Sequence, residues 1–309
     1  MSWRCAAAIV FGLSILWNLA GSLRPFTAHA VEEPLDIVVT IPVLKDFAEQ
    51  IGGSHVRVTS LLKGYESEHT YSPKPSDLVA VRNARLLFEV GIGLEVWVAS
   101  LVKNAGRDSL RVVTTSQGIA LLENGHRHGA RHNSGEGSSG NPHIWLDPEH
   151  AATMVRHMSA AMSEMDPSHA DDYNRNTITY LDRLDRTREE LTGLVRNLTD
   201  RRFVAQHPAW PYLAKRFAFD IVGTIQPQSG SEPSARHLQQ LIDVMKRNKV
   251  KVVASEVQLS QRLPQLLAHE TGARVVVLTT LPGGLPGTET YLDMLRYNVL
   301  QLVAALKEA

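Results

Sequence analysis

From residue 36 onward, short runs of apolar and mostly β-branched residues alternate with longer segments whose apolar positions recur every three or four residues. Short runs with little polar interruption are typical of strands in a parallel sheet that is covered on both faces. A spacing of three and four is typical of amphipathic helices. The pattern therefore predicts an α/β fold that is built from repeated strand–helix units.

The first half of the chain contains four predicted strands. The expected strands are 36–41, 56–62, 85–90 and 111–114, and the expected helices are 42–51, 74–83 and 93–103. Residues 123–140 then hold five glycines, three serines and three histidines, which indicates a surface loop. After this loop, Asp147 and Pro148 are an N-cap and a first helical residue, and they predict a helix through about Met165.

Asp166 and Pro167 repeat this start signal, and apolar residues then fall three and four positions apart to about Leu198. This predicts a single helix of roughly 30 residues, or about 45 Å at 1.5 Å per residue. Most globular helices are much shorter, so we interpret it as a rigid element that joins two lobes. Its apolar stripe is expected to end after roughly four turns, which favours a spacer over a coiled coil.

The second half resumes the alternation. The expected strands are 203–206, 220–224, 250–255 and 275–279, and the expected helices are 208–217, 234–248, 260–271 and 288–307. The predicted architecture has two lobes with parallel sheets, each of four βα units, which cover 31–165 and 201–309 and flank a linker helix at 166–200. Ligands of open α/β sheets bind beyond the carboxyl ends of the strands. We therefore expect the functional site in the cleft between the lobes.

The N-terminal segment, residues 1–30, differs from the rest. Arg4 precedes a mostly apolar stretch, and Ala28-His29-Ala30 is a small-x-small cleavage motif. This predicts a secretory signal peptide and a periplasmic mature chain, and an uncleaved membrane anchor is the alternative. Cys5, the only cysteine, lies in this segment, so the mature chain has no thiol. The 32 basic and 32 acidic residues of the chain argue against a nucleic-acid partner.

Three widely spaced histidines stand in similar sequence frames. His69, His143 and His207 each lie in a sequence frame that ends in a proline-started predicted helix. Histidine is the commonest metal ligand, so this pattern suggests a zinc site that forms when the chain folds. Taken singly, each of them is also compatible with a surface, packing or helix-start role. His126, His128 and His132 in the glycine-rich loop are either a weak zinc-collecting arm or part of a plain polar linker.

Four segments carry a family resemblance, namely Gly64–Asp77, Pro142–Pro148, His207–Tyr212 and Thr290–Asn298. They resemble motifs of the cluster A-I periplasmic metal-binding proteins, the solute receptors of zinc and manganese ABC importers. The resemblance covers nearly all of the mature chain. It implies two βα lobes joined by a long helix, and a receptor rather than an enzyme. It also implies an inner-membrane ABC permease and its ATPase as partners, and we expect a monomer.

The same resemblance implies that His69, His143 and His207 are the metal ligands. In the zinc branch of the family the third position is typically histidine, so His207 favours Zn²⁺ over Mn²⁺. The histidine-rich loop is also a mark of zinc members. Many relatives supply an aspartate from the turn after the last strand, but the turn here, Leu278–Gly284, has no carboxylate. The fourth ligand is therefore open between water and Glu68, with Glu256 as a third option.

Two alternative functions follow from the same residues. One is a manganese receptor of the same family. The other is a zinc-dependent hydrolase with an open fourth coordination position and Glu68 or Glu256 as general base. The sequence frames match the receptors, and no P-loop, dinucleotide fingerprint or Ser/His/Asp order supports an enzyme. Because protons compete with the metal for imidazole, we expect the affinity to fall below a pH of about 6.5.

Further residues have expected structural roles. Asp77 and Asp147 are expected to cap helices or to accept hydrogen bonds behind the site, and Trp210 and Tyr212 to pack in the cleft. The remaining histidines without such context are expected to be ordinary solvated residues: His55, His150, His157, His169, His237 and His269.

Overall fold

The computed structural model describes residues 33–123, 140–228 and 231–308. All its helices and strands belong to one unit of the chain, Pro34–Ala309. The first part contains β1 (Leu35–Val39), α1 (Pro42–Gly52), β2 (Val56–Ser60), α2 (Pro75–Asn83), β3 (Leu86–Glu89), α3 (Val98–Ala105), β4 (Arg111–Thr114) and α4 (Pro148–Met165). After α5 (Ala170–Arg196) come β5 (Arg202–Ala205), α6 (Pro211–Phe217), β6 (Asp220–Thr224), α7 (Ala235–Asn248), β7 (Val252–Glu256), α8 (Arg262–Thr271), β8 (Arg274–Leu278) and α9 (Tyr291–Lys307).

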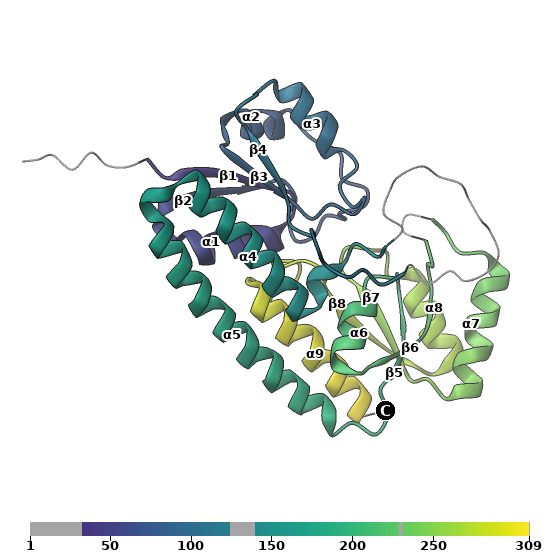
Figure 1. The fold of residues 1–309 in the computed structure, drawn as a ribbon. Helices are drawn as coiled ribbons and strands as arrows, with labels where there is room; N and C mark the ends of the chain where they lie inside the picture. The colour runs from purple at the N-terminus through teal and green to yellow at the C-terminus, as the bar shows by residue number, and fades with distance from the viewer. Residues whose placement is uncertain (1–32, 124–139, 229–230, 309) are drawn as a thin grey trace, which may run out of the picture. The chain divides into compact units, whose positions relative to one another are not determined.

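The two sheets share one topology (Figure 1). The strand orders are β2-β1-β3-β4 and β6-β5-β7-β8, and every pair is parallel. In each sheet the second strand lies on one side of the first and the third strand lies on the other side. The winding therefore reverses beside β1 and beside β5, where α/β sheets usually bind their ligands. This confirms the predicted pair of four-stranded parallel sheets.

The long helix α5 joins the two sheets. Its 27 residues correspond to about 40 Å, and Pro167–His169 forms a separate 3₁₀ turn before it. It packs against α1 and α4 from the first part of the chain and against α9 from the second (Figure 1). The expectation that its apolar stripe ends after four turns was wrong. The buried positions run along the whole helix, because tyrosines and threonines continue the stripe: Tyr173, Thr177, Tyr180, Leu184, Thr187, Leu191 and Val195.

One continuous hydrophobic cluster extends through both lobes, and a smaller one lies under α7 and α8. A buried carboxylate, Asp46 on α1, adds a polar link inside this packing. Its Oδ2 accepts hydrogen bonds from Tyr180 Oη at 3.3 Å and from the backbone N of Tyr291 at 3.1 Å. Burial raises the pKa of Asp46. The carboxylate thus ties α1, α5 and the start of α9 together. The limits of the lobes at residues 165 and 200 remain a prediction.

Helices α3, α5, α6 and α9 each begin three or more residues later than the sequence pattern predicts. Helix α3 begins at Val98 instead of Gly93, because Gly91, Ile92 and Gly93 have φ angles of 83°, 58° and 76°. The Glu95 carboxylate holds this turn by accepting from the backbone N of Val90 and of Gly91, both at 2.9 Å. Helix α6 begins at Pro211 instead of Pro208.

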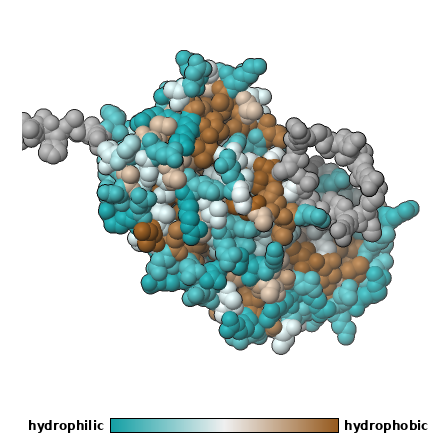
Figure 2. All heavy atoms as spheres, in the orientation of Figure 1, coloured by the Kyte–Doolittle hydropathy of each residue, from teal (hydrophilic) through white to brown (hydrophobic). Residues whose placement is uncertain are grey.

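The predicted capping roles of Asp147 and Asp77 are confirmed, whereas the start predicted at Asp166 leads into a 3₁₀ turn and α5 begins only at Ala170. Asp147 Oδ1 accepts from Glu149 N at 2.9 Å at the start of α4, and Asp77 Oδ2 accepts from Lys74 N at 2.6 Å at the start of α2. On the face drawn in Figure 2, hydrophilic residues lie mostly along the edge, and the hydrophobic residues that are visible lie mostly away from it. Within the described ranges, no helix has both the length and the apolar character that crossing a membrane requires.

Candidate metal centre

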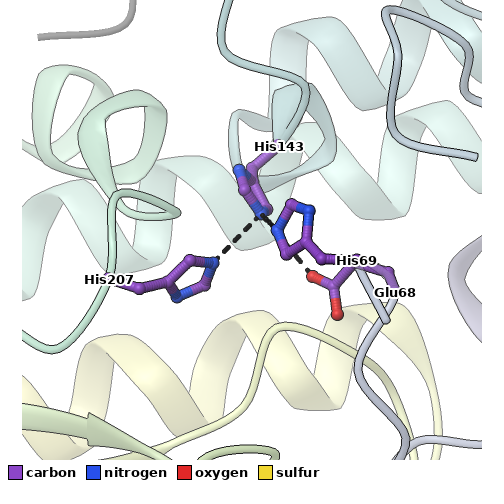
Figure 3. A group of neighbouring side chains, drawn as sticks. All are labelled: Glu68, His69, His143 and His207. Carbon is purple, nitrogen blue, oxygen red and sulfur yellow. Dashed lines mark hydrogen bonds and ion pairs between the residues drawn. The ribbon is translucent and has the colours of Figure 1, made fainter. Parts of the chain in front are cut away.

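Four side chains from three separate loops meet in the structure (Figure 3). Glu68 and His69 lie in the loop after β2, His143 lies just before the 3₁₀ turn Ile144–Leu146, and His207 follows β5. Each offers one ligand atom, and these atoms lie within 4.8 Å of one another. The three histidines singled out from the sequence are therefore brought together, and Glu68 joins them.

The histidines face one another through their Nε2 atoms. His143 Nε2 lies 3.0 Å from His69 Nε2 and 3.3 Å from His207 Nε2, and it lies 3.6 Å from Glu68 Oε1. The cluster is buried, since Glu68, His143 and His207 are 3%, 1% and 4% exposed, and only His69 is partly accessible. Glu68 Oε1 has no hydrogen-bond partner among the described residues. A buried carboxylate oxygen without a donor is costly, so this atom indicates a place for a cation.

Hydrogen bonds on the far side of two rings determine which nitrogen faces the cluster. His143 Nδ1 lies 2.9 Å from Asn141 Oδ1, and His207 Nδ1 lies 2.6 Å from Glu256 Oε1. Both oxygens are acceptors, so each Nδ1 carries the hydrogen and each Nε2 presents a lone pair to the cluster. Metal-binding histidines are commonly oriented in this way, by a carboxylate or carbonyl oxygen behind the ring.

Asn141 connects two of the histidines, a role that the sequence pattern did not indicate. Its Oδ1 also accepts from His143 N at 3.0 Å, and its Nδ2 donates to Pro208 O at 2.6 Å, directly after His207. The side chain is buried, and its own carbonyl accepts from Tyr212 Oη at 2.8 Å. The only sequence signal was its position two residues before His143, in a frame that also contains proline.

Glu256, like Asn141, is fixed by several hydrogen bonds. Trp210 Nε1 donates to Glu256 Oε1 at 2.9 Å, and Gln206 Oε1 accepts from Glu256 N at 2.8 Å. Glu256 is the last residue of β7, and His207 follows the adjacent strand β5, so the pair meets where the winding of the second sheet reverses. Trp210 and Tyr212 are buried as expected, and both stabilise groups that hold a histidine.

The electrostatics differ among the three rings. Burial, with a smaller contribution from the nearby His143, lowers the pKa of His69 to about 4. Burial also lowers the pKa of His143 well below its usual range, with a contribution from His207. Burial acts in the same direction on His207, but the charge and the hydrogen bond of Glu256 outweigh it and raise the pKa. His69 and His143 are therefore neutral near pH 7 and ready to bind metal. His207 stays protonated to a higher pH than an ordinary histidine, so metal binding there competes more strongly with a proton.

One option for the fourth ligand lies outside the cluster, and two other predictions concern residues that the structure does not describe. Glu256 was a third option for the fourth ligand, but it binds the Nδ1 side of His207, away from the cluster. In the turn Leu278–Gly284, Thr279 and Thr280 are buried, and the carbonyl of Thr280 accepts from Trp145 Nε1 at 2.8 Å. His126, His128 and His132 lie outside the described residues, as does the predicted signal segment 1–30.

Most histidines that were expected to be solvated have defined partners. His55 Nε2 lies 3.0 Å from Asp172 Oδ2, and its ring stacks on His169 with 3.9 Å between centroids. His157 Nδ1 and His237 Nε2 each lie 2.9 Å from a backbone carbonyl, those of Thr115 and Thr224. Burial lowers the pKa of His150. The expectation holds for His269, whose side chain is 85% exposed.

Two parallel α/β lobes on a long connecting helix, with a buried imidazole–carboxylate cluster between them, define a class of solute-binding protein for a metal ion. Within this class, the chain belongs to the family described as zinc-uptake complex component A, periplasmic, whose model matches residues 37–305. The members are non-enzymatic metal-binding receptors that function with the permease and ATPase of ABC transporters.

Individual relatives support this placement. The high-affinity zinc uptake system protein ZnuA of Bacillus subtilis is 28% identical over 280 residues, which covers 88% of each chain. The manganese-binding lipoprotein MntA of Halalkalibacterium halodurans is 29% identical over 283 residues, which covers 89% of this chain and 90% of the relative. A crystal structure of ZnuA is similar with a TM-score of 0.78 at 31% identity, and the match covers 89% of this chain and all of that one.

Proposed function

We propose that this protein is a periplasmic receptor that captures Zn²⁺ and delivers it, as a monomer, to an inner-membrane ABC permease for zinc uptake. His69, His143, His207 and Glu68 are the proposed ligands. Residues 1–30 are the proposed signal peptide that directs the chain to the periplasm. The observation that carries the proposal is the convergence of three imidazole Nε2 atoms and one carboxylate oxygen without a donor, all within 4.8 Å.

The ligand set favours zinc. Zn²⁺ prefers four nitrogen, sulfur or oxygen ligands in a tetrahedron, and three histidines with one carboxylate supply that number. Mn²⁺ prefers carboxylate, carbonyl and water oxygens. The relatives alone do not decide, because they include a protein named for zinc and another named for manganese. A manganese receptor is therefore the alternative that the binding experiment must test.

Glu68 has a second consequence. Three neutral histidines would leave the double charge of the ion uncompensated in a buried place, and one carboxylate offsets half of it. With Glu68 in the fourth position, the cluster keeps no open position for an activated water, which a catalytic zinc site needs. This argues for a receptor over a hydrolase, in agreement with the non-enzymatic character of the family.

The test is a calorimetric titration of the metal-free mature chain, residues 31–309, with Zn²⁺ and separately with Mn²⁺. We expect one tight zinc site, much weaker manganese binding, and loss of the tight site in His69→Ala, His143→Ala and His207→Ala. His269→Ala is the matched control, because this histidine is exposed and remote from the cluster. Tight zinc binding that survives all three changes would contradict the proposed ligands, and stronger binding of manganese would contradict the proposed metal.

A further inference from the structure

The loop that carries Glu68 and His69 reaches the second lobe at Gly64. The carbonyl of Gly64 accepts a hydrogen bond from Gln258 Nε2 at 2.7 Å. The same nitrogen donates its other hydrogen to Thr279 Oγ1 at 2.8 Å. Gln258 follows β7, whose last residue, Glu256, orients His207. A single amide group therefore connects the ligand loop of the first lobe to two turns of the second.

The two backbones approach more closely here than side chains allow. A Cβ atom on Gly64 would lie 2.3 Å from the carbonyl oxygen of Pro282. One on Gly284 would lie 2.3 Å from Thr279 Oγ1 and 2.8 Å from the carbonyl oxygen of Gly64. Only glycine fits on both sides of such a contact. The close approach places the Gly64 carbonyl within reach of the Gln258 amide.

Both sides of the contact are anchored. On the second lobe, Asn298 of α9 is fully buried, accepts from Thr279 N at 3.1 Å and donates to Thr279 O at 2.8 Å. On the ligand loop, Lys63 N donates to Glu66 Oε2 at 2.8 Å, which closes a tight turn around Gly64. Hydrogen bonds thus run from α9 through Gln258 to the turn just before Glu68.

Gln258 also lies beside the accessible side of the cluster. It lines a cavity of about 230 Å³ together with Ser67, His69, Thr70 and His207. His69 is the one partly accessible residue of the four, so an ion leaves or enters most directly on its side. Its loop is the segment that Gln258 holds, so movement of the loop away from the second lobe would break the hydrogen bond at Gly64.

We propose that Gln258 is a positioning residue that acts as a latch: it holds the Glu68–His69 loop on the second lobe and thereby slows release of the metal. This inference rests on the proposed metal-binding function. Gln258 is not one of the proposed ligands, so it should affect the rate of metal release more than the rate of metal association.

The test measures zinc release from Gln258→Leu by stopped flow, with a chromophoric chelator in excess. Loss of one hydrogen bond predicts release about three- to tenfold faster, with the association rate unchanged. Gln258→Glu keeps the shape but cannot donate when ionised, so it should show the same change. Gly64→Ala should also speed release, and its effect should not multiply with that of Gln258→Leu, since both act on one contact. Gln265→Leu, on the exposed surface of α8, is the matched control.

Hydrogen exchange in the metal-free protein gives a readout that does not depend on zinc. The peptide spanning 61–72 should exchange faster in Gln258→Leu than in the wild type. If Gln258→Leu changes neither the rate of zinc release nor the exchange of this peptide, the latch is overturned. It is also overturned if the variant lowers the association rate, the release rate and the thermal stability together, because such a pattern indicates a general packing role. Absence of zinc binding in the wild type would instead refute the proposed function, and the exchange measurement would still decide whether the latch exists.

Discussion

Replacing Glu256 tests how a residue that does not face the cluster controls metal affinity. Its carboxylate is 1% exposed, lies 2.6 Å from His207 Nδ1 and accepts from Trp210 Nε1 at 2.9 Å, in both cases through Oε1. In Glu256→Gln the amide oxygen can accept from the same two donors. The change therefore removes the negative charge and largely keeps the orientation of His207, whereas Glu256→Ala removes both.

The magnitude follows from the hydrogen bond. A hydrogen bond to a charged group contributes about 1.5–3 kcal/mol, and loss of such a partner behind a metal-binding histidine typically weakens binding about 10- to 100-fold. We expect Glu256→Gln near the lower end of this range and Glu256→Ala at the upper end. The alanine variant also leaves two buried donors unpaired, so its melting temperature should fall as well.

The assay is a competition titration against a chromophoric zinc chelator at pH values of about 7.5 and 6. The wild type has a raised His207 pKa, so protons compete with zinc more strongly there than in Glu256→Gln. The difference between the two proteins should therefore shrink at the lower pH. Glu270→Gln, on α8, is the control. Equal affinities of wild type and Glu256→Gln at both pH values would refute the assigned role of Glu256.

Three further predictions address other parts of the molecule. In the wild type, zinc affinity should fall as the pH drops through the raised pKa of His207. An affinity that does not change between pH values of about 5.5 and 7.5 would contradict neutral histidine ligands. Burial raises the pKa of Glu95 to about 7 from 4.5, so the stability gained by its protonation is present below 4.5 and lost as the pH rises to about 7. Denaturant unfolding should show up to roughly 3 kcal/mol of this loss in the wild type and much less in Glu95→Gln. Deletion of Gly125–Gly140 should remove weak zinc equivalents in a titration and keep one tight site, and an unchanged stoichiometry would reject the collecting role of the histidine-rich loop.

The sequence predicted most elements because their signals are local. Apolar runs of β-branched residues mark strands β1 to β8, and Asp147 with Pro148 marks the start of α4 through a contact between close neighbours. The late starts of α3 and α6 were missed, since long-range or unusual backbone interactions override the pattern there. Positive φ angles at Gly91–Gly93 prevent α3 from starting at Gly93, and the carbonyl of Pro208 accepts a hydrogen bond from Asn141 of another loop. The length of the buried stripe of α5 was underestimated because Thr177 and similar polar residues are also buried.

By itself, the sequence determined the α/β class and the parallel sheets, and it indicated the three candidate histidine ligands. Strand and helix periodicity and distinctive ligand residues are visible without coordinates. Only the tertiary structure decided how the side chains around these histidines are arranged. It placed Glu68 beside the histidines and Glu256 behind His207, and it made Asn141 the link between His143 and Pro208. Glu256 and His207 are far apart in the chain, as are Asn141 and Pro208, and glutamate and asparagine are common residue types. Their roles depend on which strand ends meet at the reversal of each sheet and on which ring nitrogen each hydrogen bond leaves free, and neither is encoded in local spacing.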